Sequence, residues 1–561
     1  LCSFFFFPGY LQLYRKSYFF RNVSSGWGAV QIVFLGSVIG IACTSVPVGK
    51  DASVDGSVMT THTCDGWYDA RLVVVPGQTF EAGAMMPIYK NICIQSRPNV
   101  ELKKVGEIPQ VEKTYTYYHV GYPCMNENQV IIGETTFGGR REFGNGDAWI
   151  EIDQLEILGL QRSKTARECI EIMGALAEKY GYGDGGECLT VTDPNEAWHF
   201  EIMGPGPLWA PNSGKPGAVW VAQRIPDGEV GVSANRARIG EINLDDKKNF
   251  MASSNIFTLG EEMGFYDSKS GKPFNFYEVY APVEIGGPYY SSRREWRVLS
   301  LVAPSLNLDP YAERFPFTVK PDKKLSVQDL MDIKRDHYEG TEFDLTTGMA
   351  AGPFGTPDRF ATPGAVKPED RKNVDWERAI SLFRCSYSFI SQARSWLPNP
   401  IGGLIWFGED VPHSTCFVPF YCQVTEVPVS FSVGRRDIFD RNFAWWPFNF
   451  VSNWADLKYS YMIEDIKATQ HEVEGDFLAM QAAVEMAALE LYKKDPDLAV
   501  KYLTNYSNSC ANRAVERWWK LADDLIAKYD DGYVDALTSV GYPTWWLEEV
   551  GYGDTTIKGY N

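Results

Sequence analysis

Four short runs of β-forming residues follow one another between residues 187 and 234, and they constrain the fold most. The runs span 187–192, 197–202, 218–225 and 229–234. Turn sequences separate them, Asp-Pro-Asn at 193–195 and Pro-Asp-Gly at 226–228. Short strands joined by such turns form antiparallel meanders, whose buried face needs a covering layer. We therefore predict an α+β protein in which helices cover antiparallel sheets.

Helical periodicity supplies that covering layer. Apolar residues recur at three- and four-residue spacing over 162–180, and Gly181 can end this helix. After residue 465 the pattern is helical again, with two apolar stripes typical of core-facing helices. We predict one body over 43–460, with a helical extension over 461–561 packed on the same body.

The stretch 29–42 is apolar apart from Gln31 and Ser37, follows basic residues, and ends in small residues at 40 and 42. This layout is typical of a secretory signal peptide, and 14 residues fall short of the about 20 that span a bilayer. We predict that 1–42 is a leader and that the mature protein is secreted or periplasmic, without stable membrane insertion. A buried core helix is the alternative. A cysteine after the cleavage point also allows a cell-surface lipoprotein.

Residues just after the leader are predicted to form a hairpin-like return. A β-rich run over 43–48 is followed by a turn at Asp55-Gly56 and a second run over 57–62. This return brings residues 60–65 beside Cys43.

Charge and cysteine usage exclude several classes of function. The net charge is −19 and no basic stripe offsets it, so nucleic acid is a poor partner. The 11 cysteines are scattered and the 6 histidines are isolated, without paired metal-ligand spacing. We predict no metal site and no cofactor, and a homo-oligomer remains open.

Two stretches carry a resemblance to a known family. Cys43 begins the sequence CTSVPVGKDASVDGS, and 336–355 reads DHYEGTEFDLTTGMAAGPFG, followed by Pro-Asp-Arg at 357–359. Both resemble the bacterial dipeptidase A-like family of N-terminal-nucleophile cysteine peptidases. The resemblance implies a four-layer αββα fold, shared with penicillin V acylases and bile salt hydrolases, and hydrolysis of small peptide substrates at Cys43.

The resemblance also implies site residues. Cys43 would hold both nucleophile and base, because a terminal α-amine titrates at about 7.7–8.0 and can accept the proton of a thiol with a pKa of about 8.5. Asp65 would orient the amine and the attacking group. Asn235, at a strand end, would donate to the oxyanion. Arg294 is favoured over Arg297 as the site arginine, which polarises the site or binds a carboxylate.

One position departs from the family pattern. Relatives place arginine where this chain has His62, so a positive charge beside the thiol would have to come from elsewhere, for example from Arg71. A dipeptidase must also recognise both free ends of its substrate. Glu339, Asp344 and Arg359 are the predicted substrate-binding residues.

The leading hypothesis is a secreted cysteine dipeptidase that forms an acyl-enzyme on Cys43. An N-acyl amide hydrolase of the same superfamily is the rival within enzymes. A lipid-anchored, non-catalytic binding protein is the alternative outside them.

Overall fold

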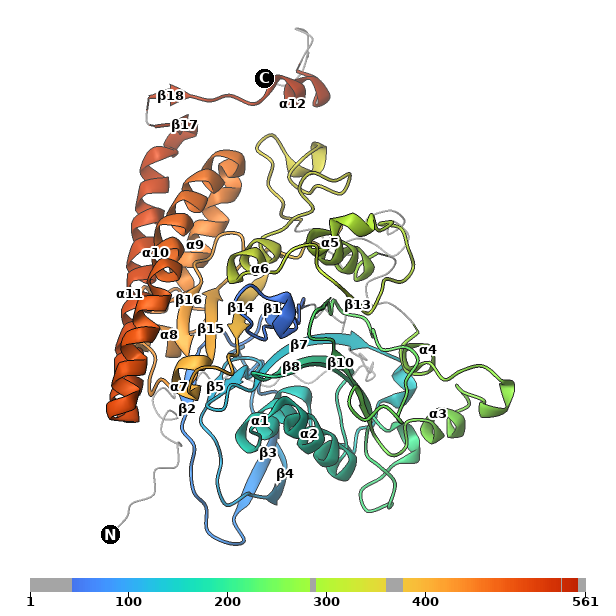
Figure 1. The fold of residues 1–561 in the computed structure, drawn as a ribbon. Helices are drawn as coiled ribbons and strands as arrows, with labels where there is room; N and C mark the ends of the chain where they lie inside the picture. Colours follow the sequence, from blue (N-terminus) through green and yellow to red (C-terminus); the bar gives the residue numbers. More distant parts are fainter. Residues whose placement is uncertain (1–42, 283–288, 360–376, 536, 553–561) are drawn as a thin grey trace, which may run out of the picture. The chain divides into compact units, whose positions relative to one another are not determined.

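The structure, a computed structural model, describes residues 43–282, 289–359, 377–535 and 537–552, so the predicted leader lies outside the described residues. Contacts group residues 40–561 into one compact unit. This unit contains two large antiparallel sheets and helices packed on them (Figure 1), which confirms the α+β prediction. The boundary near residue 460 stays a prediction.

The larger sheet contains the predicted meander. Its eight strands are, in spatial order, β12 (Phe250–Ala252), β10 (Val219–Ile225), β9 (Ala197–Met203), β8 (Gly186–Thr192), β7 (Ile131–Gly138), β6 (Met125–Asn126), β5 (Tyr117–His119) and β2 (Val73–Val75). Three of the four predicted strands are therefore β8, β9 and β10. The fourth is only β11 (Val230–Gly231), which pairs with β13 (Thr318–Val319) outside the large sheet.

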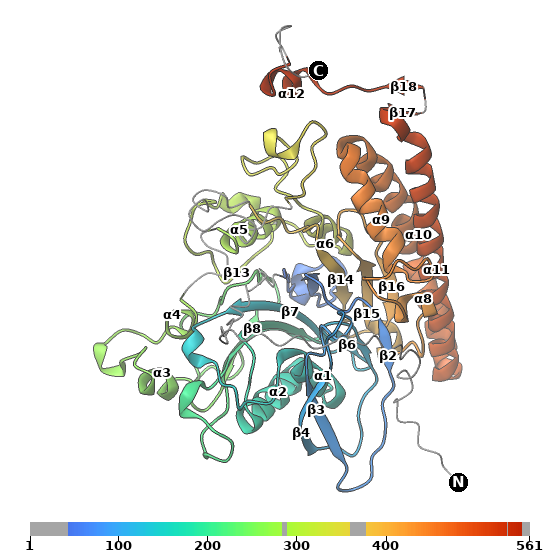
Figure 2. The ribbon, with the colours of Figure 1, turned by 180° about the vertical axis from the view of Figure 1, so that it is seen from behind.

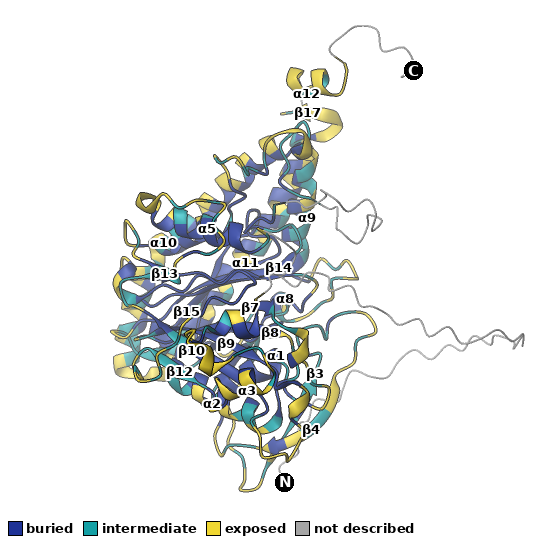
Figure 3. Cartoon of the chain, turned by 90° about the vertical axis from the view of Figure 1, so that its right-hand side faces the viewer, coloured by how far each residue is buried: buried dark blue, intermediate teal, exposed yellow. Residues whose placement is uncertain are grey.

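The smaller sheet has four strands from distant parts of the chain. They are β1 (Thr61–Asp65), β14 (Cys385–Gln392), β15 (Leu404–Glu409) and β16 (Val418–Tyr421). β1 pairs with β14, with Thr61 opposite Ile390, and contacts β7 of the larger sheet. Buried residues fill most strands of both sheets, whereas β2 and β12, at the two ends of the larger sheet, are half-buried (Figure 3).

Helices cover each sheet. α1 (Ile152–Arg162) and α2 (Ala166–Tyr180) pack on the larger sheet, and α9 (Trp445–Ala455), α10 (Tyr459–Lys494) and α11 (Pro496–Lys528) pack on the smaller one (Figure 2). The predicted helix over 162–180 is broken at its start, because the Thr165 side chain caps α2 by accepting from the Glu168 amide. Gly181 follows α2 with φ of 83°, as an end-of-helix glycine does.

The remaining helices and strands lie outside these two sheets and the helices named above. They are β3 (Met85–Lys90), β4 (Lys103–Pro109), α3 (Thr258–Glu262), α4 (Phe276–Tyr280), α5 (Ser292–Val302), α6 (Val327–Lys334), α7 (Asn399–Gly402), α8 (Val429–Ser432), β17 (Tyr533–Val534), β18 (Thr538–Ser539) and α12 (Thr544–Glu549). Among the described residues, no helix has the length and apolar character of a membrane span.

The hairpin-like return predicted for residues 43–62 is present, although 43–48 forms isolated bridges instead of a strand. Val48 bridges Met59, and Ser45 bridges Ser233. The Thr44 amide donates to Thr63 Oγ1 at 2.9 Å, so the start of the described chain lies against β1.

Candidate active site

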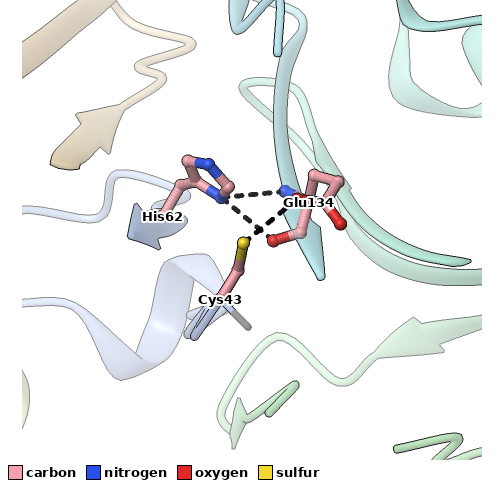
Figure 4. Close-up of side chains that lie close together, drawn as sticks. All are labelled: Cys43, His62 and Glu134. Atoms are coloured by element: carbon pink, nitrogen blue, oxygen red, sulfur yellow. Dashed lines mark hydrogen bonds between the residues drawn. The ribbon is translucent and has the colours of Figure 1, made fainter. Parts of the chain in front are cut away.

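Cys43 lies between the two sheets and is fully buried. Its thiol donates to Glu134 Oε2 at 3.2 Å, from β7 of the larger sheet (Figure 4). Burial, followed by the negative charge of Glu134, raises the pKa of the Cys43 thiol well above its ordinary value. The thiol therefore needs a proton acceptor before it can act as a nucleophile near neutral pH.

Arg294, on α5, joins the Cys43 segment to the segment that contains Asn235. Its Nη1 donates to the Cys43 carbonyl at 2.8 Å, and its Nη2 donates to Asn235 Oδ1 at 2.8 Å. The guanidinium is fully buried, and burial lowers the pKa of Arg294 to about 10, which leaves it charged at neutral pH. Of the two candidate arginines, Arg294 is therefore the one beside Cys43.

Asn235 lies four residues after the end of β11 and adopts the left-handed conformation, with φ of 66°. Asparagine tolerates this conformation better than most residues, which gives the position a local reason for its side chain. Its Nδ2 donates to the Thr136 carbonyl at 2.7 Å, so the amide lies two residues along β7 from Glu134.

Asp65 ends β1 and is fully buried. Its Oδ2 accepts from Arg378 Nη2 at 2.5 Å and from Thr63 Oγ1 at 3.3 Å. The charge of the Asp65 carboxylate contributes to the raised pKa of the Cys43 thiol, and the Asp65 backbone amide acts in the opposite direction. Asp65 therefore lies beside the nucleophile, and a buried arginine balances its charge.

Three residues of this group had no motif to indicate them: Glu134, Lys334 and Arg378. Lys334 ends α6, is fully buried, and its Nζ donates to the Thr44 carbonyl. Burial and the charge of Arg294 lower the pKa of Lys334 to about 7, while Asp65 opposes that shift. Arg294, Arg378 and Lys334 thus surround Cys43 and Asp65 with cationic groups.

His62 does not supply a positive charge beside the thiol. Its ring is buried against Tyr122, Tyr387 and Phe389, and Nδ1 accepts from the Glu134 amide at 3.2 Å. Burial, followed by the charge of Lys334, lowers the pKa of His62 to about 3. Arg71, the other residue considered for this role, forms an ion pair with Asp69.

A buried neutral histidine makes stability depend on pH. The unfolded chain binds a proton at His62 near pH 6.5, whereas the folded chain binds it only near pH 3. The contribution of His62 is therefore complete above pH 6.5 and is lost as pH falls toward 3. Between pH 7 and 4 we expect the wild type to lose about 3 kcal/mol more free energy of unfolding than His62→Gln.

Urea unfolding at the two pH values measures this difference. His471→Gln is the control, because that histidine is exposed on α10 and should keep the wild-type pH dependence. Equal losses in wild type and His62→Gln would contradict a neutral, buried His62.

The three predicted substrate-binding residues lie in the 336–359 segment and bond mainly to their own loop. Glu339 accepts from the His337 amide at 2.6 Å, and Asp344 accepts from the Thr346 amide at 2.8 Å. Arg359 donates to the carbonyls of Thr356 and Leu345 at 2.8 and 2.7 Å. The structure gives them a part in shaping this loop, and their contact with substrate stays a prediction.

Two groups of side chains among the described residues have the donor types that bind a metal ion. One is Cys43 with His62 and Glu134, and the other is Cys188 with His199 and Glu201. Spacing along the chain does not reveal either group, because Cys43, His62 and Glu134 are far apart in sequence and Cys188 lies on β8 while His199 and Glu201 lie on β9. In both groups the donors already form hydrogen bonds with one another or with backbone, such as Cys188 Sγ to His199 Nε2 at 3.0 Å.

Comparison with known proteins identifies a family of peptidases. A probable dipeptidase from Latilactobacillus sakei is 28% identical over 506 residues, which cover 87% of this chain and 95% of that protein. Dipeptidase A from Lactobacillus helveticus is 23% identical over 87% of this chain and 98% of that protein. A probable dipeptidase from Salmonella dublin is 27% identical over 70% of this chain and 83% of that protein. The profile of Peptidase family C69 matches residues 42–472, most of the chain, and this chain therefore belongs to Peptidase family C69.

Proposed function

We propose that this protein hydrolyses dipeptides through an acyl-enzyme on Cys43, after residues 1–42 have been removed. The observation that carries the proposal is the double contact of Arg294, which binds the Cys43 carbonyl and the Asn235 side chain. One guanidinium thus fixes the proposed nucleophile relative to the proposed oxyanion donor. The names of the relatives, dipeptidase and probable dipeptidase, support the substrate class.

The chemistry follows from these positions. Once Cys43 is the first residue, its α-amine accepts the thiol proton, and the thiolate attacks the scissile carbonyl carbon. Asn235 donates to the oxyanion of the tetrahedral intermediate. One such donor lowers the activation free energy by about 3 kcal/mol. The leaving amine takes the proton as the C–N bond breaks, and water then hydrolyses the thioester. Asp65, held by Arg378, orients the α-ammonium.

Two further proposals accompany this one. The leader-like stretch before Cys43 supports a secreted or periplasmic protein. The two contacting sheets, with helices packed on each, support the four-layer αββα arrangement of N-terminal-nucleophile hydrolases.

The test begins with protein recovered from a secreting host. Sequencing and intact mass of its N-terminus should give Cys43 as the first residue, without lipid. That protein is then assayed on a panel of unprotected dipeptides and N-acyl amino acids, and we expect turnover of the dipeptides. Cleavage of the N-acyl compounds alone would favour the amidase alternative. An active form that retains upstream residues, or a diacylglyceryl group on Cys43, would refute the proposed base.

A further inference from the structure

A carboxylate beside the proposed nucleophile is a feature that neither the motif match nor the relatives' names explain. Glu134 Oε2 lies 3.2 Å from Cys43 Sγ, and the Glu134 side chain is fully buried. A negative charge at this place opposes thiolate formation and raises the pKa of Cys43. A group that hinders formation of the nucleophile needs another function.

Glu187 lies behind Glu134. In the pairing of β7 with β8, Thr136 is opposite Glu187 and Glu134 is opposite Leu189, so the two glutamates are diagonal neighbours on one face. Burial raises the pKa of Glu134 to about 7. Burial, followed by the charge of Glu134, raises the pKa of Glu187 well above its ordinary value, so Glu187 keeps its proton more readily than Glu134 does.

Two buried polar atoms in this part of the structure are unsatisfied. Glu187 Oε2 and the Tyr182 hydroxyl have no hydrogen-bond partner among the described residues. The charges of Asp184 and Glu134 act on the Tyr182 phenol. Buried polar atoms usually have partners, so these atoms indicate a place for a polar ligand. The negative potential around them indicates that the ligand is a cation.

The distances fit the amino group of a substrate. In any α-amino acyl group the nitrogen lies about 2.5 Å from its carbonyl carbon. A carbonyl carbon ready for attack lies about 3–3.5 Å from the sulfur. The ammonium of a bound dipeptide is therefore held within a few ångströms of Sγ, in the region that Glu134 Oε2 occupies. When the thiol loses its proton, Oε2 also loses that donor, and an ammonium N–H replaces it.

We infer that Glu134, supported by Glu187, binds the free α-ammonium of the substrate and restricts this enzyme to peptides with an unblocked amino terminus. This inference rests on the proposed function and deepens it. It assigns to β7 a role that the sequence had placed in the 336–359 loop. An N-acyl compound without the ammonium would leave the buried carboxylate without its cation, which disfavours the amidase alternative.

The decisive experiment uses a matched pair of substrates. The dipeptide that the mature wild-type protein cleaves fastest is compared with its des-amino analogue, in which hydrogen replaces the ammonium group. We expect kcat/KM to be at least about 10³-fold higher for the dipeptide, because a site built for a polar group rejects the analogue lacking it. Equal rates on the two compounds would overturn the inference while leaving the proposed hydrolase intact. Failure on every unprotected dipeptide would instead overturn the proposed function.

The variant Glu134→Gln separates this role from acid–base chemistry. We expect a loss of at least about 100-fold in kcat/KM on the dipeptide and a change below about threefold on the des-amino analogue. A parallel loss on both substrates would assign Glu134 to proton transfer or to folding and overturn the inference. Glu156→Gln is the control, since that buried glutamate on α1 lies outside the Cys43 contacts described above, and it should keep the wild-type ratio. If Glu134→Gln does not fold, equal rates of the wild type on the two substrates would still overturn the inference.

Discussion

The variant Cys43→Ser, produced with the same N-terminus as the wild type, should lose at least about 10³-fold in kcat. A serine hydroxyl holds its proton far more tightly than a thiol does. An α-amine with a pKa of about 7.7–8.0 is therefore too weak a base to remove that proton efficiently. Steady-state hydrolysis of the fastest dipeptide measures the effect.

Two observations keep this result interpretable. The unfolding midpoint of Cys43→Ser should stay within a few degrees of wild type, because the oxygen is smaller than sulfur and polar neighbours surround it. Cys510→Ser is the control, since this cysteine is buried on α11, in the layer of C-terminal helices. It should lower stability slightly and keep activity. Unchanged turnover in Cys43→Ser would remove Cys43 from the mechanism.

The variant Arg294→Met should damage both stability and catalysis. The guanidinium donates to the carbonyls of Cys43, Ala234 and Tyr290, and also to the side chains of Thr44 and Asn235. Methionine leaves these buried acceptors without that donor, at about 1–3 kcal/mol for each group that finds no replacement. We expect the free energy of unfolding to fall by at least about 3 kcal/mol. We expect kcat/KM to fall by at least about 100-fold, because Cys43 and Asn235 are no longer fixed relative to each other.

Arg297→Met, one turn along α5, is the matched control. Arg297 forms an ion pair with Asp336 at 2.5 Å and donates to the Glu339 carbonyl, so its loss also destabilises the fold. It should keep kcat/KM within a few-fold of wild type, since none of its bonds reaches Cys43. Urea unfolding and dipeptide assays on both variants separate the two effects. Equal catalytic losses would mean that Arg294 acts only through stability.

The sequence by itself determined the features that depend on neighbouring residues. The β-rich runs and turns predicted β8, β9 and β10, because side-chain periodicity and turn chemistry are local. The same local chemistry predicted the return that places β1 beside Cys43, which the Val48–Met59 bridge confirms. The helix prediction missed the break before α2, where a single threonine cap competes with continuous periodicity.

Only the tertiary structure decided which charged residues meet at Cys43. Glu134 is 91 residues from Cys43 in the chain, and Arg378 is 313 residues from Asp65. No local pattern marks them, because Glu134 lies within an ordinary strand and Arg378 in the loop before β14, and the tertiary fold brings both to the site. Burial then sets their chemistry. It lowers the pKa of His62, which is therefore neutral, and the pKa of Lys334, because the cost of burying a charge depends on the whole surroundings. The fold also places the Glu134 carboxylate beside the Cys43 sulfur.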